Sequence, residues 1–235
     1  MYRYYDAPFK IVKGGITLTL EQEGERLLYR SVYADEKVEK ILLADNGKLL
    51  INPVEPLNKP KELTSYLLIE FERTLVVEPG STKSIFITYP IEIGVFIAGS
   101  NQFEIIDILT LAKQKFTLYG DPRSGVICKY WRSEVYSSIP SVDPLHEGVI
   151  ELSITNTTTW WVEVTKAIFN AYGMKIYYND NLVSMKATMK IMSGRSAETD
   201  FVDSPLENGM KKSLELYTVR RLPVVATKFV MEVGI

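Results

Sequence analysis

Apolar and polar residues alternate along several segments of this chain, and this period of two is the feature that most constrains its fold. Successive side chains of a β-strand point to opposite faces, so such a segment buries one face and leaves the other in water. The pattern is clearest in residues 16–20, 91–97, 150–155 and 185–191. Residues 35–43 fit a short helix as well as a strand. The sequence therefore predicts an all-β fold of antiparallel sheets with little helix.

A repeated pattern suggests that the chain contains two related β units. Residues 82–86 (TKSIF) resemble residues 165–169 (TKAIF), and residues 68–70 resemble residues 149–151 upstream of them. Two tandem antiparallel β-sandwich units of the immunoglobulin-like type, related by an internal duplication, would explain these matches. The alternative is that β-strands resemble one another because they draw on few residue types.

The length of 235 residues allows one large β domain or two domains of about 100 residues each. With the repeat, we predict a β-sandwich domain over residues 1–110 and another over residues 111–235. Asn46 and Gly47 predict a tight hairpin between the segments on either side, because both tolerate a positive φ. Residues 118–127 predict a second hairpin.

Composition and charge exclude several classes of protein. The net charge of −2 creates no global field that would recruit nucleic acid or anionic lipid, although a local patch could still do so. Cys128 is the only cysteine, so the chain forms neither an internal disulfide nor a cysteine-based zinc site, which fits a reducing, cytoplasmic setting. We expect no signal peptide, and no transmembrane segment, because no apolar run approaches the necessary length.

Few residues suggest catalysis. His146 is the only histidine and lies in a turn-like stretch, where a solvated loop side chain is the alternative to a general base. Glu55 and Glu92 each follow a proline, and with Asp121 they complete the weak catalytic candidates. Glu92 interrupts an apolar strand, so it either lies on the solvated face, pairs with an arginine at a domain contact, or shares a proton or divalent cation with another carboxylate. We expect neither a metal nor a cofactor.

Residues 113–136 combine cations with aromatic side chains, a pattern typical of sheets that bind single-stranded nucleic acid. Half-buried strands use the same aromatic residues for packing alone. Period-two geometry places Lys129 and Trp131 on one face, and Tyr130 and Arg132 on the other. We expect only one of these pairs to face solvent, and we expect no specific nucleic-acid binding.

Trp160 and Trp161 form a second candidate binding site, resembling the edge of a carbohydrate or protein contact. Adjacent strand residues point to opposite faces, so we expect one ring inside and the other outside or under a neighbouring element. Cys128 lies in an apolar strand, where we expect a small buried hydrophobe.

Five distinctive segments run through most of the chain: residues 51–56 (INPVEP), 90–95 (PIEIGV), 118–120 (LYG), 125–131 (GVICKYW) and 231–235 (MEVGI). Together they resemble a family of archaeal proteins of unknown function. The resemblance implies an archaeal cytosolic protein and transfers no catalytic residue.

Taken together, these observations favour a non-catalytic binding or assembly module that contacts a protein partner or forms a homo-oligomer. The alternatives are a carboxylate-dependent hydrolase acting on a sugar or a phosphorylated substrate, and a weak binder of single-stranded nucleic acid. For the hydrolase, at least two candidate carboxyl groups must converge within roughly 5–10 Å.

Overall fold

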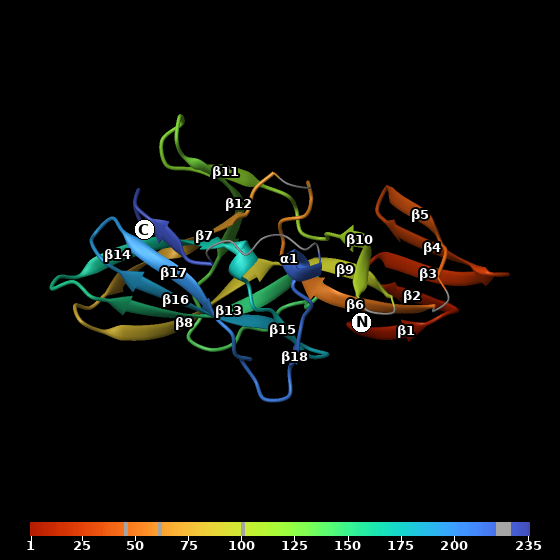
Figure 1. Ribbon diagram of the computed structural model, residues 1–235. Helices are drawn as coiled ribbons and strands as arrows, with labels where there is room; N and C mark the ends of the chain where they lie inside the picture. The colour runs from red at the N-terminus through yellow and green to blue at the C-terminus, as the bar shows by residue number, and fades with distance from the viewer. Residues whose placement is uncertain (45–46, 61–62, 100–101, 220–226) are drawn as a thin grey trace. The chain divides into compact units, whose positions relative to one another are not determined.

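The computed structural model confirms an all-β protein, in which four sheets hold the strands and one sheet curls into half a barrel (Figure 1). The structure describes residues 1–44, 47–60, 63–99, 102–219 and 227–235, with the side chains of residues 217–218 left undescribed. Contacts divide the chain into two units, described separately below. Unit 1 comprises residues 1–53 and 93–109, and unit 2 comprises residues 54–92 and 110–235.

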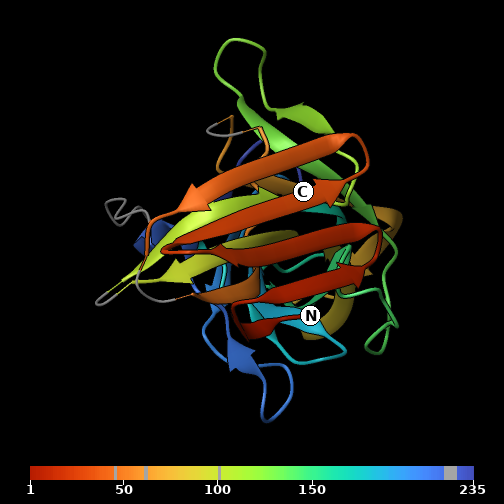
Figure 2. The ribbon, with the colours of Figure 1, turned by 90° about the vertical axis from the view of Figure 1, so that its right-hand side faces the viewer.

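Unit 1 contains two four-stranded sheets. One is the meander β2-β3-β4-β5, which faces the viewer in Figure 2. The other has the order β1-β6-β9-β10, and β9 begins at Glu92, the last residue of the segment 54–92 of unit 2. The inward side chains, such as those of Leu18, Tyr29 and Ile51, are fully buried. The strands are β1 (Arg3–Asp6), β2 (Phe9–Lys13), β3 (Ile16–Glu23), β4 (Arg26–Tyr33), β5 (Glu36–Leu42), β6 (Lys48–Val54), β9 (Glu92–Ala98) and β10 (Phe103–Leu109).

A buried carboxylate connects the two sheets of unit 1. The β9–β10 pairing shifts register between Ile105 and Asp107, and Asp107 is only 9% exposed. Its Oδ2 accepts hydrogen bonds from Tyr29 OH at 2.9 Å and from Ser31 Oγ at 2.6 Å, both on β4. Its Oδ1 accepts from the Ile108 amide at 2.9 Å. The buried charge is therefore stabilised by neutral donors.

Unit 2 contains a four-stranded sheet, β11-β12-β7-β14, and a larger sheet, β18-β15-β16-β13-β8, which β17 and β19 extend from β16. Two hydrogen bonds at Thr88 on β8 join the two sheets: Trp131 Nε1 on β12 donates to Thr88 Oγ1, and the Thr88 amide donates to Ser133 Oγ on β12. The elements are β7 (Tyr66–Val77), β8 (Thr82–Pro90), β11 (Phe116–Tyr119), β12 (Val126–Ser133), β13 (Glu147–Asn156), β14 (Val162–Asn170), η1 (Ala171–Gly173), β15 (Tyr177–Tyr178), β16 (Val183–Ile191), β17 (Ala197–Val202), β18 (Lys211–Lys212), α1 (Leu216–Val219) and β19 (Phe229–Met231).

The alternating segments are strands, but the prediction of one wet face and antiparallel pairing holds only in part. Residues 16–20, 150–155 and 185–191 bury every second residue, whereas residues 91–96 are buried on both faces. Residues 36–42 form β5 rather than a helix. Two strand pairs, β7–β12 and β13–β16, are parallel. Alternation alone does not distinguish these pairings.

One predicted hairpin forms and the other does not. Residues 118–127 form the β11–β12 hairpin. The hairpin at Asn46 and Gly47 is wrong, because β5 and β6 belong to different sheets; Asn46 itself lies outside the described residues. The predicted boundary at residue 110 stays a prediction. It differs from the division by contacts, in which residues 54–92 group with unit 2.

The repeated segments of the sequence pair crosswise in unit 2. β7 holds residues 68–70 and pairs antiparallel with β14, which holds residues 165–169. β13 holds residues 149–151 and pairs antiparallel with β8, which holds residues 82–86. On its other side, β7 pairs in parallel with β12, and β13 pairs in parallel with β16. The first strand of each repeat therefore pairs with the second strand of the other.

In the part of the chain that the structure describes, no helix has the length and hydrophobicity that crossing a membrane requires.

Candidate functional site

The most unusual side-chain cluster in unit 2 is a buried ion pair between Glu92 and Lys129. Lys129 Nζ lies 3.0 Å from Glu92 Oε1, and the two side chains are 1% and 0% exposed. The other carboxylate oxygen, Oε2, accepts hydrogen bonds from the Asn58 amide at 2.9 Å and from Asn58 Nδ2 at 3.0 Å. Both oxygens of Glu92 thus have partners inside the protein.

Burial dominates the electrostatics of this pair. It lowers the pKa of Lys129 below the usual lysine value, and the adjacent Glu92 carboxylate opposes that shift. The interpretation of Glu92 as a solvated residue or as the partner of an arginine is therefore wrong, because a charge at this depth needs a close counter-charge and Lys129 supplies it. Asn58 was not identified from the sequence, since a lone asparagine in a proline-rich stretch gives no distinctive signal.

The strand that carries Lys129 places the candidate nucleic-acid residues on two different faces. On the Lys129 face, Trp131 Nε1 donates to Thr88 Oγ1 at 3.1 Å, and the ring is only partly exposed. On the other face, Tyr130 is partly exposed and Arg132 fully so. Of the two arrangements left open, the structure exposes the pair Tyr130 and Arg132. Lys129 is buried and offers no cation at the surface.

Acidic neighbours surround the exposed pair. Tyr130 OH donates to Glu70 Oε2 at 2.6 Å, and this hydrogen bond raises the pKa of the tyrosine. Arg132 Nε lies 3.8 Å from Glu72 Oε1. Because carboxylates already flank both side chains, this surface presents mixed rather than positive charge to a phosphate backbone.

Of the remaining catalytic candidates, Glu55 adjoins the Glu92 cluster, because its carbonyl accepts from Asn58 Nδ2 at 2.6 Å, whereas Asp121 and His146 lie in turns at the surface. Glu55 is buried, and its Oε1 accepts from the Leu216 amide at 3.2 Å. Asp121 is exposed and accepts from the Arg123 amide at 2.8 Å, and His146 Nδ1 lies 3.0 Å from Asp143 Oδ2 at the surface. Within the described ranges, no three His, Cys, Asp or Glu side chains gather as a metal site would require.

Cys128 is fully buried, as predicted. Burial raises the pKa of its thiol to about 12, so the reactive thiolate is scarce at neutral pH.

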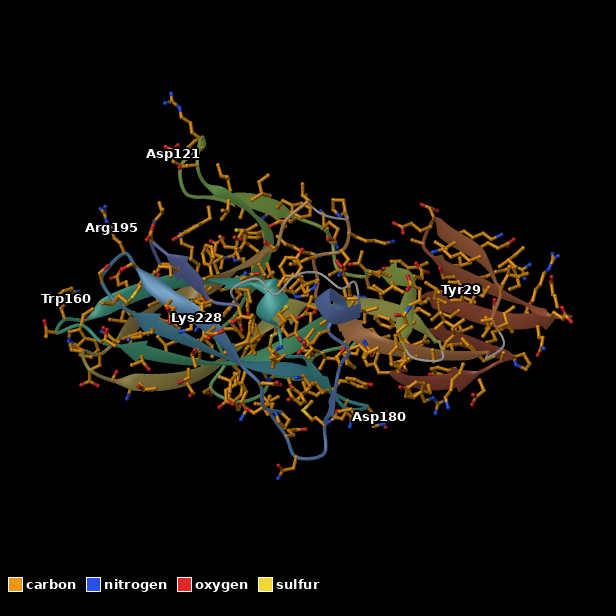
Figure 3. All side chains as sticks on the ribbon, viewed as in Figure 1. Tyr29, Asp121, Trp160, Asp180, Arg195 and Lys228 are labelled. Carbon is orange, nitrogen blue, oxygen red and sulfur yellow. The ribbon has the colours of Figure 1, made fainter. Side chains whose placement is uncertain are left out.

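Trp160 and Trp161 lie in the connection between β13 and β14 and are 54% and 61% exposed. Figure 3 shows Trp160 at the end of this connection, beyond the strand ends of unit 2. The expectation that one ring is inside is wrong, because the two residues belong to a loop, where strand alternation does not apply. We call residues 157–161 the Trp loop.

Asn156, the last residue of β13, holds the Trp loop in place. It is 0% exposed, and its Nδ2 donates to the carbonyls of Val77 at 3.0 Å and Trp160 at 2.9 Å. Its Oδ1 accepts from the amide and hydroxyl of Thr158, at 3.0 and 2.8 Å. The Thr157 hydroxyl donates to the Ile191 carbonyl at 2.6 Å. The loop is therefore anchored to β7, β13 and β16.

The sequence analysis also did not identify Asn156 as a structural residue, although the alternation of β13 indicates that its side chain is buried. It follows Leu152 and Ile154 at the inward-facing positions of β13, so alternation places an amide where an apolar side chain is expected. A polar residue at a buried position requires hydrogen-bond partners, and the nearest ones belong to the adjoining loop.

Comparison with known proteins identifies a family without identifying an activity. The sequence model of the family described as "Protein of unknown function (DUF432)" matches residues 1–232. No curated protein and no solved structure matches the chain.

Proposed function

We propose that this chain, which belongs to the DUF432 family of proteins of unknown function, is a non-catalytic module that binds another protein through the Trp loop. The observation that carries the proposal is the exposure of both Trp160 and Trp161, at 54% and 61%, on a loop with buried anchors.

Tryptophan is a favourable residue for such a contact. A large, rigid aromatic side chain buries much apolar area on binding and loses little conformational entropy, which is why tryptophan is enriched among the residues that dominate binding energy. The hydrogen bonds of Asn156 and Thr158 fix the loop before any partner arrives. Preorganisation of this kind reduces the entropic cost of association.

The buried ion pair supports a non-catalytic role. A general acid or base needs access to substrate and a free oxygen. Glu92 has neither, because Lys129 and Asn58 contact its two oxygens and its side chain is 0% exposed. The side chains of Asp121 and His146 bond within their own turns, and this arrangement favours binding over carboxylate-dependent hydrolysis.

The proposal is tested with the double variant Trp160→Ala/Trp161→Ala. The matched control is Ile41→Ala/Leu43→Ala, which removes two aliphatic residues that are 59% and 81% exposed in unit 1. Quantitative affinity capture from a native lysate should recover a defined partner with the wild type and with the control. We expect at least a tenfold loss of that partner with the tryptophan variant. Equal recovery by all three proteins would contradict the proposal.

We also propose that unit 2 arose by duplication of an immunoglobulin-like β unit and that the protein works in the cytoplasm. The crosswise pairing of the repeated strands supports the first proposal. The single, buried cysteine supports the second, because it suits a compartment where disulfides do not form. Fractionation of cells and detection of the protein in the membrane-free fraction would test the location.

A further inference from the structure

Strand β11 has an open edge. It pairs with β12 on one side, and in the described part of unit 2 no strand pairs with its other side. Figure 1 shows the turn after β11 projecting from the unit, whereas Tyr119 at the end of β11 packs against Phe229 of β19. Edge strands of this kind are usually protected by a charge, a proline or a bulge. The sequence of β11, FTLY, contains neither a charge nor a proline.

The phase of the β11–β12 hydrogen bonds identifies the backbone groups on the open side. The Tyr130 amide donates to the Lys115 carbonyl at 2.8 Å, so residue 115 turns its polar groups toward β12. Hydrogen-bonded and non-hydrogen-bonded positions alternate along an antiparallel pair. Residues 117 and 119 therefore bond to β12 as well, whereas Phe116 and Leu118 direct their N–H and C=O groups to the open edge.

Exposed apolar side chains accompany these unpaired backbone groups. Leu118 and Ile127 are direct cross-strand partners, so their side chains share one face, and they are 45% and 46% exposed. Leu63 is 42% exposed, and its neighbour Thr64 donates to the Ile127 carbonyl. Further along the same face of β12, Lys129 contacts Glu92 at the start of β9, and Trp131 contacts Thr88 on β8. Leu118 and Ile127 thus continue the apolar face of the sheet into solvent.

The charges at the two ends of β11 fit a second copy of the same strand. Lys113 and Lys115 precede it, and Asp121 follows it. All three side chains are exposed. An antiparallel pair centred on Thr117 would place Phe116 of each copy opposite Leu118 of the other. The same arrangement brings the lysine end of each strand beside the Asp121 end of its mate.

We propose that two copies of this chain associate through antiparallel pairing of their β11 strands, with Leu118 and Ile127 covering the join. This surface differs from the Trp loop, so the inference goes beyond the proposed function and either can fail alone. A four-residue edge with a small apolar patch is small beside the roughly 1,000 Å² that stable interfaces bury. The dimer should therefore be weak and should dissociate on dilution.

Sedimentation equilibrium over a wide range of concentration tests the proposal. The wild type should change reversibly from monomer to dimer. Leu118→Pro removes an outward amide and the leucine side chain while sparing the bonds to β12, and should weaken dimerisation by at least about tenfold. Leu118→Ala retains the amide and should have an intermediate effect. A wild type that remains monomeric at every concentration would overturn the proposal.

Charge exchange at exposed positions outside β11 provides a second test. Asp121→Lys should weaken the dimer because it places positive charges at both ends of β11. Lys113→Asp added to Asp121→Lys should restore much of the affinity, because the opposite charges meet again in the exchanged order. Trp160→Ala/Trp161→Ala and Leu43→Ala should leave dimerisation unchanged. A dimer unaffected by both Leu118→Pro and Asp121→Lys must use another surface, and this result would refute the inference.

Discussion

Asp107 in unit 1 and Glu92 in unit 2 are both buried carboxylates, and they are stabilised by different means. In unit 1, Asp107 accepts hydrogen bonds from Tyr29, Ser31 and the Ile108 amide, all neutral donors. In unit 2, Glu92 faces the Lys129 ammonium group at 3.0 Å and receives two further hydrogen bonds from Asn58. Burial and the nearby Asp107 raise the pKa of Tyr29, whereas burial lowers the pKa of Lys129.

This difference determines how each site responds to a lost partner. The Asp107 charge is distributed over several neutral donors, so removal of one leaves the others in place. Glu92 depends on a single cation, and removal of that cation leaves an unbalanced charge in a water-free environment. We therefore expect unit 2 to depend strongly on one residue and unit 1 to tolerate single changes.

The largest effect should come from Lys129→Met, which retains most of the side-chain volume and removes the charge. We expect this change to lower the free energy of unfolding by about 3–5 kcal/mol, since Glu92 stays buried without its counter-charge. Urea denaturation followed by tryptophan fluorescence measures this effect in unit 2. All three tryptophans, Trp131, Trp160 and Trp161, belong to that unit.

A second variant and a thiol measurement sharpen this prediction. Replacing both partners, by Lys129→Met with Glu92→Leu, should recover much of the lost stability because no charge remains buried.

Cys128 is buried in the same unit, and the pKa of its thiol is raised to about 12, so the native protein should react slowly with thiol reagents. Labelling should accelerate in Lys129→Met. A loss of less than 1 kcal/mol would indicate that Asn58 alone stabilises the carboxylate.

Tyr29→Phe should have an intermediate effect in unit 1. It removes one hydrogen bond to Asp107 and should cost about 2 kcal/mol, as expected for a hydrogen bond to a charged group. Far-UV circular dichroism should detect this loss, whereas tryptophan fluorescence should be less sensitive because unit 1 contains no tryptophan.

The double variant Tyr29→Phe/Ser31→Ala extends the comparison between the units. Asp107 Oδ2 then lacks both hydroxyl donors, and the loss should exceed the sum of the single losses because the last donor removed leaves the charge unsatisfied. Strict additivity of the two changes would contradict the view that the hydroxyl groups substitute for one another.

An exposed carboxylate should show the smallest effect and thus provides a baseline. The hydrogen bond from Lys212 Nζ, at 2.7 Å, lowers the pKa of Asp203, and Tyr177 OH also donates to it at 2.7 Å. Because the folded pKa lies below the unfolded value, this stabilisation is present above about pH 4 and is lost as the pH falls through the folded pKa. Asp203→Asn should remove this pH dependence.

The size of the Asp203 effect should be small, because the Asp203 side chain is half exposed and water screens the pair. We expect a few tenths of a kcal/mol. Urea midpoints for the wild type and Asp203→Asn at pH 3 and pH 6 measure it. An effect as large as that of Lys129→Met would show that burial does not explain the contrast between the two units.

Local pattern predicted the strands well and their partners poorly. Residues 150–155 alternate in the sequence and alternate in burial along β13, because side-chain direction is a property of the strand itself. Whether β13 pairs in parallel with β16 depends on segments about 35 residues apart, which alternation does not encode. The hairpin at Gly47 failed for the same reason, since its turn residues favour a tight turn but do not specify which strands pair.

The sequence identified several residues of the candidate sites, but it did not predict their partners or their exposure to solvent. Glu92 was recognised as an unusual charge in an apolar strand, yet its cation, Lys129, lies 37 residues away and was considered only as a candidate for nucleic-acid binding. Trp160 and Trp161 were identified correctly as conspicuous, but their exposure depends on where β13 ends. The buried Asn156 amide stabilises that end, and its role requires knowledge of three neighbouring segments.

The crosswise pairing of β7 with β14 and of β13 with β8 also affects the order in which the chain can fold. As the ribosome releases the chain, β7 and β8 appear well before either antiparallel partner has been synthesised. Unit 1 has the same delay. Its strand β6 pairs with β9, which is synthesised only after β7 and β8. Such long sequence separations slow folding and expose strand edges in the meantime. A nascent chain stalled near residue 130 should therefore bind chaperones strongly.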